Sequence, residues 1–513
     1  MSQVQLESVT RTIQYRDPVL LFHHLVREGE NGLLLESAEV DSKRHLQSFL
    51  MVKAALRLTC RGFQVQVESL SPNGDALLIG LADALNVGPL EAGAKEFLIE
   101  YQPIDQNLDE DQRLESDSVM TPLRQIQQIV QVNSTIKEAL FMGGMLGYDL
   151  VECFEPLPEV TDGMAPNYVM YVAEQLIRLD HVRNEGHLVG SYFYQQDQPA
   201  LREAFEEQIE KTCQRCDSLS LIDLPPAAEN NESVEVDKTD EQYCQIVRDL
   251  KERILHGEVF QIVPSRSFSM PCPSPLRAYR QLRILNPSPY MFLMQDESFS
   301  LFGASPEMAI KFEAETRTVE VCPIAGTRRR GKHEDGSIDH DLDGRIELEL
   351  RTDVKEMAEH LMLVDLARND LARICTPGSR HVAKLLKVDR YSHVMHLVSN
   401  VKGILRSPLD ALHAYQACMN MGTLTGAPKV RAMQLIREVE KKRRDNYGGG
   451  IGYMLGNGDM ETCIVIRSAI VKDGVARVQA GAGIVYDSVP QSEADETRTK
   501  AAAVLTALAK AHL

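Results

Sequence analysis

Short polar and glycine-rich segments crowd the last third of the chain and decide its fold and chemistry. They read PIAGTRRRG (323–331), EHLMLVDLARNDLARI (359–374), VMHLVS (394–399), MGTLTGAPKVRAM (421–433), YGGGIGY (447–453), CIVIRS (463–468), QAGAGIVYDS (479–488) and PQSEADETRTK (490–500). Helix-like runs, glycine loops and strand-like runs alternate along them. Each loop or helix end carries a group suited to bind an anion or a divalent cation. We therefore expect a site for an anionic ligand in this part of the chain.

The composition is ordinary for a soluble globular protein. The chain has 513 residues, of which 43% are hydrophobic and 25% charged, and this length suggests about two to four domains. No apolar run reaches the roughly 18 residues that a membrane span needs. The N-terminus lacks a basic segment followed by an apolar core, so we expect no export signal and a cytoplasmic location.

Ten scattered cysteines favour reduced thiols over a disulfide framework. Cys213 and Cys216 form a lone CxxC, and without a second pair we expect no metal or redox role for them. The net charge of −19 argues against nucleic acid as a partner, because basic groups supply that affinity. An anionic substrate must therefore be held by local positive charge.

The chain divides at a segment rich in Pro, Asn and Glu. We expect an N-terminal domain over 1–221, a linker over 222–238 and a larger domain over 239–513. Strands are predicted at 32–36, 63–68, 168–173 and 188–194, and helices at 200–217 and about 239–256. The pattern alone leaves parallel βαβ units possible.

Two helical segments each carry a pair of glutamates three residues apart. These pairs are Glu356 with Glu359 and Glu493 with Glu496. This spacing places both carboxylates of a pair on one helix face. Four converging carboxylates suit Mg²⁺, which keeps several waters and takes one or two carboxylates directly. The alternative for the second pair is a helix start, in which the acids complement the dipole and form a capping box with Ser492.

Arg467 is the clearest candidate for anion binding. It lies in CIVIRS, a strand-like and otherwise apolar run, where a guanidinium needs a partner. A bidentate carboxylate ligand matches its geometry, and an internal salt bridge is the alternative. The segments Gly481-Ala482-Gly483 and Gly326-Thr327 let a ligand approach backbone N–H groups, although tight turns explain them equally well.

His396 lies in VMHLVS, an apolar and strand-like context. A histidine there is more often a core residue with its hydrogen bonds satisfied than a catalyst. An imidazole that titrates near neutrality is nevertheless a good general acid. The residues alone leave both interpretations open.

Taken together, these motifs resemble the chorismate-utilising enzymes, and most closely the large subunits of anthranilate synthase. The resemblance implies an α+β fold with antiparallel sheets packed by helices in two domains. It implies Mg²⁺ as cofactor, held by Glu359 and Glu496, with Glu356 and Glu493 reaching the ion through water. Catalytic positions would be His396, Thr423 and Gln261. The substrate would contact Gly326, Thr327, Tyr447, Arg467, Gly481, Ala482, Gly483 and Lys429.

Two positions distinguish between the reactions of this family. Water-adding relatives carry a lysine where this chain has Gln261, which cannot serve as a general base. Aminodeoxychorismate synthases, the closest alternative, typically carry a nucleophilic lysine where this chain has Ala325. Both differences favour ammonia as the nucleophile, and the resemblance then implies anthranilate and pyruvate as products. A non-enzymatic amino-acid-binding protein is disfavoured, because Glu359, Glu496, His396 and Arg467 occur together.

The resemblance also implies a partner and an inhibitor. None of the cysteines lies in a GxCxGxQ-type turn, so glutamine-derived ammonia would come from a separate amidotransferase subunit. In anthranilate synthases, segments like LLES and NPSPYM form a feedback site for L-tryptophan. Here they provide Glu36 and Ser37, together with Pro289, Tyr290 and Met291.

Overall fold

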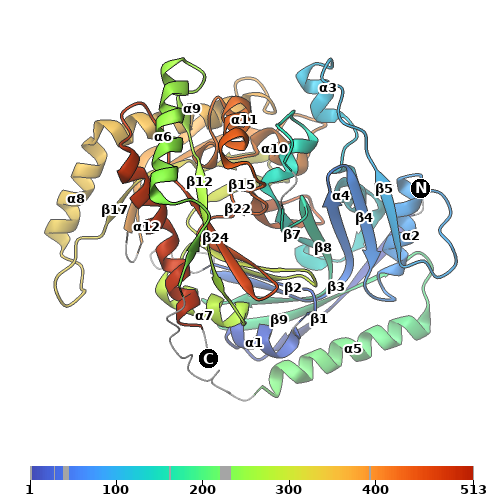
Figure 1. Cartoon of the computed structure of the whole chain (residues 1–513). Helices are drawn as coiled ribbons and strands as arrows, with labels where there is room; N and C mark the ends of the chain where they lie inside the picture. The colour runs from blue at the N-terminus through green and yellow to red at the C-terminus, as the bar shows by residue number, and fades with distance from the viewer. Residues whose placement is uncertain are drawn as a thin grey trace.

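The computed structural model describes residues 3–27, 29–37, 46–160, 163–219, 233–391 and 394–511. Helices pack around antiparallel strands, which confirms the predicted α+β class (Figure 1). The helices are α1 (Pro18–Leu25), α2 (Asp75–Ala84), α3 (Glu110–Glu115), α4 (Thr121–Ile129), α5 (Pro199–Asp217), α6 (Asp240–Leu255), α7 (Pro275–Leu285), α8 (His340–Thr352), α9 (Val354–Ala372), α10 (Ala411–Cys418), α11 (Lys429–Glu440) and α12 (Pro490–Ala509), with 3₁₀ turns η1 (Lys137–Ala139), η2 (Tyr148–Cys153) and η3 (Gly422–Leu424).

The strands differ widely in length. In the first half they are β1 (Val4–Ile13), β2 (Gly32–Glu36), β3 (Gln47–Arg61), β4 (Gln64–Ser69), β5 (Glu96–Glu100), β6 (Val130–Asn133), β7 (Phe141–Leu146), β8 (Tyr168–Asp180) and β9 (Glu185–Tyr194). In the second half they are β10 (Glu235–Val236), β11 (Gln261–Ile262), β12 (Ser265–Pro271), β13 (Tyr290–Gln295), β14 (Ser300–Ser305), β15 (Met308–Glu313), β16 (Thr318–Val321), β17 (Ile324–Arg329), β18 (His381–Arg390), β19 (Val394–Ile404), β20 (Gly426–Ala427), β21 (Gly450–Leu455), β22 (Met460–Ile464), β23 (Ser468–Lys472) and β24 (Val475–Gly481).

Strands from the two halves of the chain pair with each other. β2 pairs with β13, and β7 pairs with β21, so hydrogen bonds join segments that are far apart in sequence. The pairings between the described strands are antiparallel, apart from that of β1 with β6. The parallel βαβ alternative is therefore wrong.

The strands and helices expected in the first half are confirmed as β2, β4, β8, β9 and α5, and the helix after the linker as α6. Residues 222–232 of the predicted linker lie outside the described residues. The C-terminal end of the predicted linker is part of the sheet, because β10 pairs with β12 and places Val236 opposite Phe268. The division into two domains stays a prediction.

The start of α6 follows directly from its sequence. The Thr239 hydroxyl accepts from the backbone N–H of Gln242 at 3.3 Å, and the Gln242 side chain accepts from the Thr239 N–H at 2.8 Å. Asp240 and Glu241 follow in the first turn, where acids complement the helix dipole. The helix ends before Gly257, whose φ of 77° is accessible without strain only to glycine.

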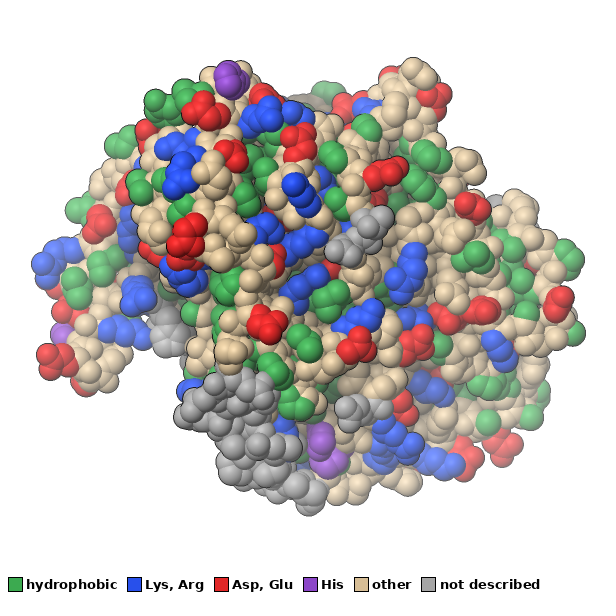
Figure 2. Space-filling view, viewed as in Figure 1, with side chains coloured by type: hydrophobic (Ala, Val, Ile, Leu, Met, Phe, Trp, Pro, Cys, Tyr) green, Lys and Arg blue, Asp and Glu red, His purple; other side chains and the backbone are tan. Residues whose placement is uncertain are grey.

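The interior holds apolar side chains together with all ten cysteines, which are buried and unpaired. Cys213 and Cys216 face inward on α5. None of the described helices is both long and apolar enough to cross a membrane. Figure 2 shows acidic and basic side chains interspersed over one face of the molecule.

Candidate active site

His396 lies near the start of β19, opposite Thr327 of β17. Its Nδ1 is 2.9 Å from the Thr327 hydroxyl oxygen, and its ring meets that of Tyr391 edge-on at 5.4 Å between centroids. Burial lowers the pKa of His396 to about 4, and the nearby positive charge of Arg467 adds to this effect. The imidazole is therefore neutral at pH 7, unlike the group titrating near neutrality that the sequence suggested.

Glu307, which the sequence did not single out, lies in the turn between β14 and β15. It is only 6% exposed, and its Oε1 accepts a hydrogen bond of 3.1 Å from the Thr423 hydroxyl. Burial raises the pKa of Glu307 to about 8, although the Thr423 hydrogen bond opposes the rise. At neutral pH this carboxyl group is mostly protonated and can donate a proton. The signal in the sequence was a lone acid between two apolar strands, LFGAS and MAIKF.

Arg467 does not lie on a strand, so that expectation is wrong. β22 ends at Ile464 and β23 begins at Ser468, and Arg467 occupies the connection with a left-handed φ of 51°. Such a conformation is costly for a residue with a side chain. The guanidinium makes no ion pair or side-chain hydrogen bond with the described residues. Burial lowers the pKa of Arg467, and the negative charges of Tyr447, Glu496 and Glu307 oppose this shift.

The glycines at the end of β24 allow close packing in the site. A Cβ on Gly481 would lie 2.6 Å from the carbonyl oxygen of Pro264 and 3.2 Å from the Tyr447 hydroxyl. A Cβ on Gly483 would lie 2.7 Å from Gln261 Nε2, so the amide of Gln261 lies directly over this glycine. Gln261 Oε1 is buried and has no hydrogen-bond partner. The structure thus brings Gln261, Tyr447 and the two glycines together.

The neighbouring predicted residues are positioned by the same elements. Ala482 is fully buried in an apolar cluster, and its N–H donates to Pro264 O at 3.3 Å. Gly326 on β17 has a φ of 74°, and a Cβ there would lie 3.1 Å from Glu356 Oε2. The β17 backbone beside His396 therefore touches the first turn of α9.

Glu356 and Glu359 lie on α9, and Glu493 and Glu496 on the first turns of α12. Burial raises the pKa of Glu359 to about 7; Lys355 opposes the rise, and the other three carboxylates add to it. Burial also raises the pKa of Glu493. Carboxylates influence one another in this way only at short range, so both helices point their acids into one region.

These carboxylates supply oxygen ligands of the kind that Mg²⁺ takes. Glu359 Oε1 is buried without a hydrogen-bond partner, while Lys500 Nζ lies 2.6 Å from Glu496 and Arg328 Nη1 lies 2.8 Å from Glu356. Among the described residues, no three acidic, His or Cys side chains already converge as a metal site. Two direct carboxylates with water and substrate suit this ion. The alternative capping box is wrong, because Val489 precedes α12 and no side chain caps it.

Lys429 makes its polar contacts with residues that the sequence did not single out. Its ammonium is 2.6 Å from Asp370 Oδ2 and 2.7 Å from the carbonyl oxygen of Cys418, neither of which belongs to the predicted site. It also lines a separate cavity of about 60 Å³ together with Arg373 and Met433. The structure therefore gives Lys429 a role in joining α11 to α9.

The two segments expected to bind tryptophan do lie side by side. In the pairing of β2 with β13, Glu36 stands opposite Met291. The carboxylate of Glu36 turns toward α7, where the Tyr279 hydroxyl donates to it and Arg283 Nε lies 2.9 Å away. The backbone N–H of Ser37 donates to Gln47 O at 3.3 Å. Tyr290, after Pro289, donates to Glu461 at 3.1 Å.

Comparison with known proteins identifies the family of this chain. Residues 90–506 match the family model of chorismate binding enzymes, and the chain belongs to that family. Anthranilate synthase component 1 of Vibrio cholerae is 56% identical over 505 residues, covering 97% of this chain and 95% of its own length. That of Escherichia coli is 53% identical over 512 residues, covering 99% and 98%. Within this family, the chain belongs with anthranilate synthase component 1.

Solved structures agree on the fold. The crystal structure of anthranilate synthase component I from Streptococcus pneumoniae superimposes with a TM-score of 0.69 at 28% identity, covering 96% of this chain and 99% of that chain. The menaquinone-specific isochorismate synthase MenF of Escherichia coli has a TM-score of 0.68 at 17% identity. At that identity, the second match speaks for the fold alone.

Proposed function

We propose that this chain converts chorismate and ammonia to anthranilate and pyruvate, the first step toward L-tryptophan. The observation that carries the proposal is the Arg467 guanidinium, which has no ion-pair partner in the described residues and lies close to Glu307 and Tyr447. A half-buried cation without an ion-pair partner favours a carboxylate ligand, which it can bind with two parallel hydrogen bonds. The glycine backbone at 481–483 lets the ring of such a ligand approach closely.

Protonated Glu307 is the natural proton donor for the departing hydroxyl. Ammonia adds at ring carbon 2, the ring double bonds shift, and the hydroxyl at carbon 4 leaves as water with the proton from Glu307. Thr423 holds the carboxyl group through its hydrogen bond. Neutral His396, oriented by Thr327, offers a hydrogen bond without adding charge. Loss of the side chain as pyruvate then makes the ring aromatic.

Mg²⁺ is the cofactor that the carboxylates would hold. Glu359 and Glu496 would bind it directly, with Glu356 and Glu493 acting through water. When bound, the ion offsets the charge of the substrate's ring carboxylate. We expect Glu496→Gln to abolish turnover while the chain stays folded, because a neutral amide binds Mg²⁺ weakly. Near-normal turnover of this variant at limiting Mg²⁺ would contradict the assignment.

Ammonia would come from glutamine through a separate amidotransferase subunit. We expect the purified chain to make anthranilate from chorismate, Mg²⁺ and ammonium salt, but to make none from glutamine. Fluorescence follows the product, and its mass distinguishes anthranilate from an aminodeoxychorismate. Adding the amidotransferase subunit should restore glutamine use. Glutamine-driven turnover by the isolated chain would overturn the partner proposal. We place the enzyme in the cytoplasm, because ten unpaired cysteines suit a reducing compartment.

L-Tryptophan is the proposed feedback inhibitor, bound where β2 meets β13. Ser37 offers a hydroxyl at the end of β2, and the Pro289–Met291 segment offers apolar and aromatic surface for an indole. Tyr290 and Tyr453 both donate to Glu461, at 3.1 and 3.4 Å, which fixes the aromatic side of this region. The supporting observation is the register of the two strands, which brings two distant segments into contact.

A further inference from the structure

Arg266 is an almost completely buried guanidinium that the proposed chemistry does not use. It lies on β12, with 1% of its surface exposed, opposite Ala480 of β24. Its planar group packs near the rings of Tyr243 and Phe268, at 5.1 and 5.4 Å from their centroids. Burying a charge of this kind is costly unless every donor finds a partner. The partners of Arg266 therefore indicate what it does.

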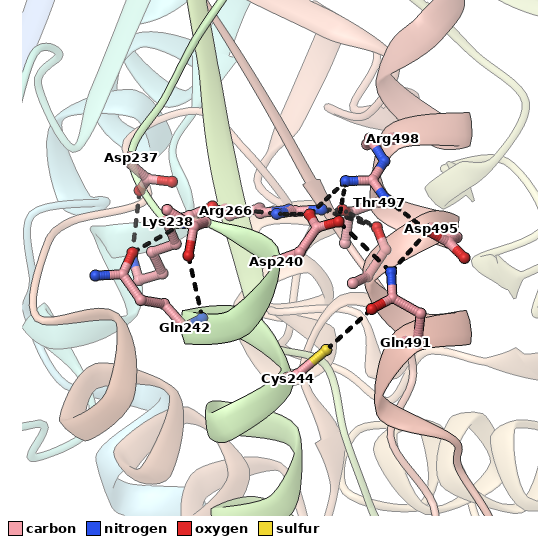
Figure 3. A network of polar contacts seen from close by, with 12 residues as sticks. Asp237, Lys238, Asp240, Gln242, Cys244, Arg266, Gln491, Asp495, Thr497 and Arg498 are labelled. Atoms are coloured by element: carbon pink, nitrogen blue, oxygen red, sulfur yellow. Dashed lines mark hydrogen bonds and ion pairs between the residues drawn. The ribbon is translucent and has the colours of Figure 1, made fainter.

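Two of these partners, Ala494 and Thr497, lie in the second turn of α12, and Figure 3 shows Thr497 beside Arg266. Arg266 Nε donates to the Thr497 hydroxyl at 2.8 Å, and Nη2 donates to the carbonyl oxygen of Ala494 at 2.9 Å. The Thr497 hydroxyl in turn donates to the same Ala494 carbonyl at 2.7 Å. These three bonds form a closed ring, and Ala494 and Thr497 are both fully buried.

The remaining donor reaches α6. Arg266 Nη1 lies 2.8 Å from Asp240 Oδ1 and 3.1 Å from the Lys238 carbonyl oxygen. Hydrogen bonds from Arg498 and Arg266 lower the pKa of Asp240 to about 2, so it is ionised at neutral pH. α6 and α12 lie side by side over β12 and β24 (Figure 1). One guanidinium thus joins a sheet strand to both helices.

The geometry of α12 indicates what the hydrogen bonds of Arg266 to this helix do. Ala494 and Thr497 are three residues apart and lie on one face of the helix, while Glu493 and Glu496 lie on the adjacent face, one residue earlier. Glu496, the proposed direct Mg²⁺ ligand, therefore projects from the turn that Arg266 contacts, and Glu493 projects from the end of the first turn, directly before it. Glu493 lies in the first turn of the helix, which no side chain caps. Helix starts without a cap tend to fray.

We infer that Arg266 is a positioning residue that fixes the first two turns of α12, and so sets where Glu493 and Glu496 meet Glu356 and Glu359. The inference rests on the proposed function, since the metal gives this placement its purpose. Lysine cannot replace Arg266 here. A single ammonium can keep the ion pair with Asp240, but it cannot also reach two acceptors on α12 in the fixed geometry of a planar fork.

The test measures metal binding apart from turnover. Mn²⁺ is added to the full chain with chorismate but without ammonia, and the EPR signal of free Mn²⁺ gives the dissociation constant. We expect Arg266→Lys to weaken Mn²⁺ binding by about tenfold or more, as when supporting contacts around metal ligands are lost. If Arg266→Lys fails to fold, Thr497→Val serves as a second variant. It keeps the shape of the side chain but removes the hydroxyl that accepts from Arg266, so it should also weaken Mn²⁺ binding.

Arg498→Gln is the matched control on the same helix. Arg498 is 46% exposed and pairs with Asp240 and Asp495 at the surface, so its loss should leave Mn²⁺ binding unchanged. With Mg²⁺ and ammonium, Arg266→Lys should lower kcat more than it raises KM for chorismate. If it lowers the melting temperature but binds Mn²⁺ as the parent does, Arg266 is only a packing residue and the inference is wrong. If the parent itself binds no Mn²⁺, the metal proposal fails and this inference fails with it.

Discussion

At the scale of single residues, the site holds two buried groups in their neutral forms. Glu307 has its pKa raised to about 8 by burial, and His396 has its pKa lowered to about 4, also chiefly by burial. Between these pH values the carboxyl group of Glu307 keeps its proton, and the imidazole of His396 is uncharged, with a proton on only one of its two ring nitrogens. Glu307 ionises as the pH rises through about 8, so kcat/KM for chorismate should fall above that pH when free ammonia is held constant.

Replacing Glu307 tests this assignment. Glu307→Gln keeps the size and can still accept from Thr423, but it has no proton to give. We expect turnover to fall by about 10²–10⁴-fold and the alkaline decline in kcat/KM to disappear. Initial rates of anthranilate fluorescence across neutral and alkaline pH measure both. Glu313→Gln is the matched control, since Glu313 is 53% exposed on β15. An unchanged pH profile in Glu307→Gln would assign the acid elsewhere.

Candidate site residues were easier to predict from the sequence than their protonation states. Arg467 and His396 attracted attention as polar side chains in apolar runs, and the four glutamates attracted it by their spacing of three residues on helical segments; the roles of these residues came from the family resemblance. Sequence reasoning missed Glu307, since a lone acid after Ser-Pro reads as an ordinary turn. The neutral form of His396 could not be predicted from the sequence either. Both depend on burial by β14, β17 and η3, and one-dimensional spacing does not record burial.

At the scale of elements, the start of α9 combines a helix cap with the first acid of the site. The Asp353 carboxylate accepts from the backbone N–H groups of Lys355 and Glu356, at 3.0 and 3.1 Å, and lies 2.8 Å from Arg328 Nη2. We expect Asp353→Ala to lower the free energy of unfolding by about 1 kcal/mol, because the cap is lost. A lower urea midpoint measures this. Asp353→Ser keeps a capping oxygen and should recover most of it; a parent-like midpoint for Asp353→Ala would refute the role of the cap.

Element types were predictable where the local pattern was strong. Strand-like runs at 32–36 and 188–194 became β2 and β9, and capping chemistry placed the start of α6. The pattern failed at Arg467. CIVIRSAIV reads as one continuous strand, yet the chain passes from β22 to β23 through a left-handed residue. Apolar residues on both sides of the break hide it, since they are buried in either arrangement.

At the scale of the whole molecule, the pairing of β2 with β13 joins the two halves of the chain. No local pattern encodes this register, because it arises from strands far apart in sequence. Glu36 links it further to α7, through Tyr279 and Arg283. α7 and α12 bury side chains in the same apolar cluster. A movement of β2 relative to β13 can therefore be transmitted through the packed side chains of α7 to α12, the helix that carries Glu493 and Glu496.

Tryptophan inhibition tests this coupling. A ligand between β2 and β13 inhibits only if it binds the less active arrangement more tightly, and about 1–3 kcal/mol of coupling is typical. Ser37→Phe should fill the pocket and abolish inhibition, yet leave uninhibited turnover within about twofold, because Ser37 lies at the end of β2 and outside the catalytic residues. Inhibition curves with ammonium as nucleophile measure both. Ser218→Phe, at an exposed serine after α5, should stay as sensitive as the parent. If Ser37→Phe stays sensitive, or loses catalysis together with sensitivity, tryptophan acts at another place.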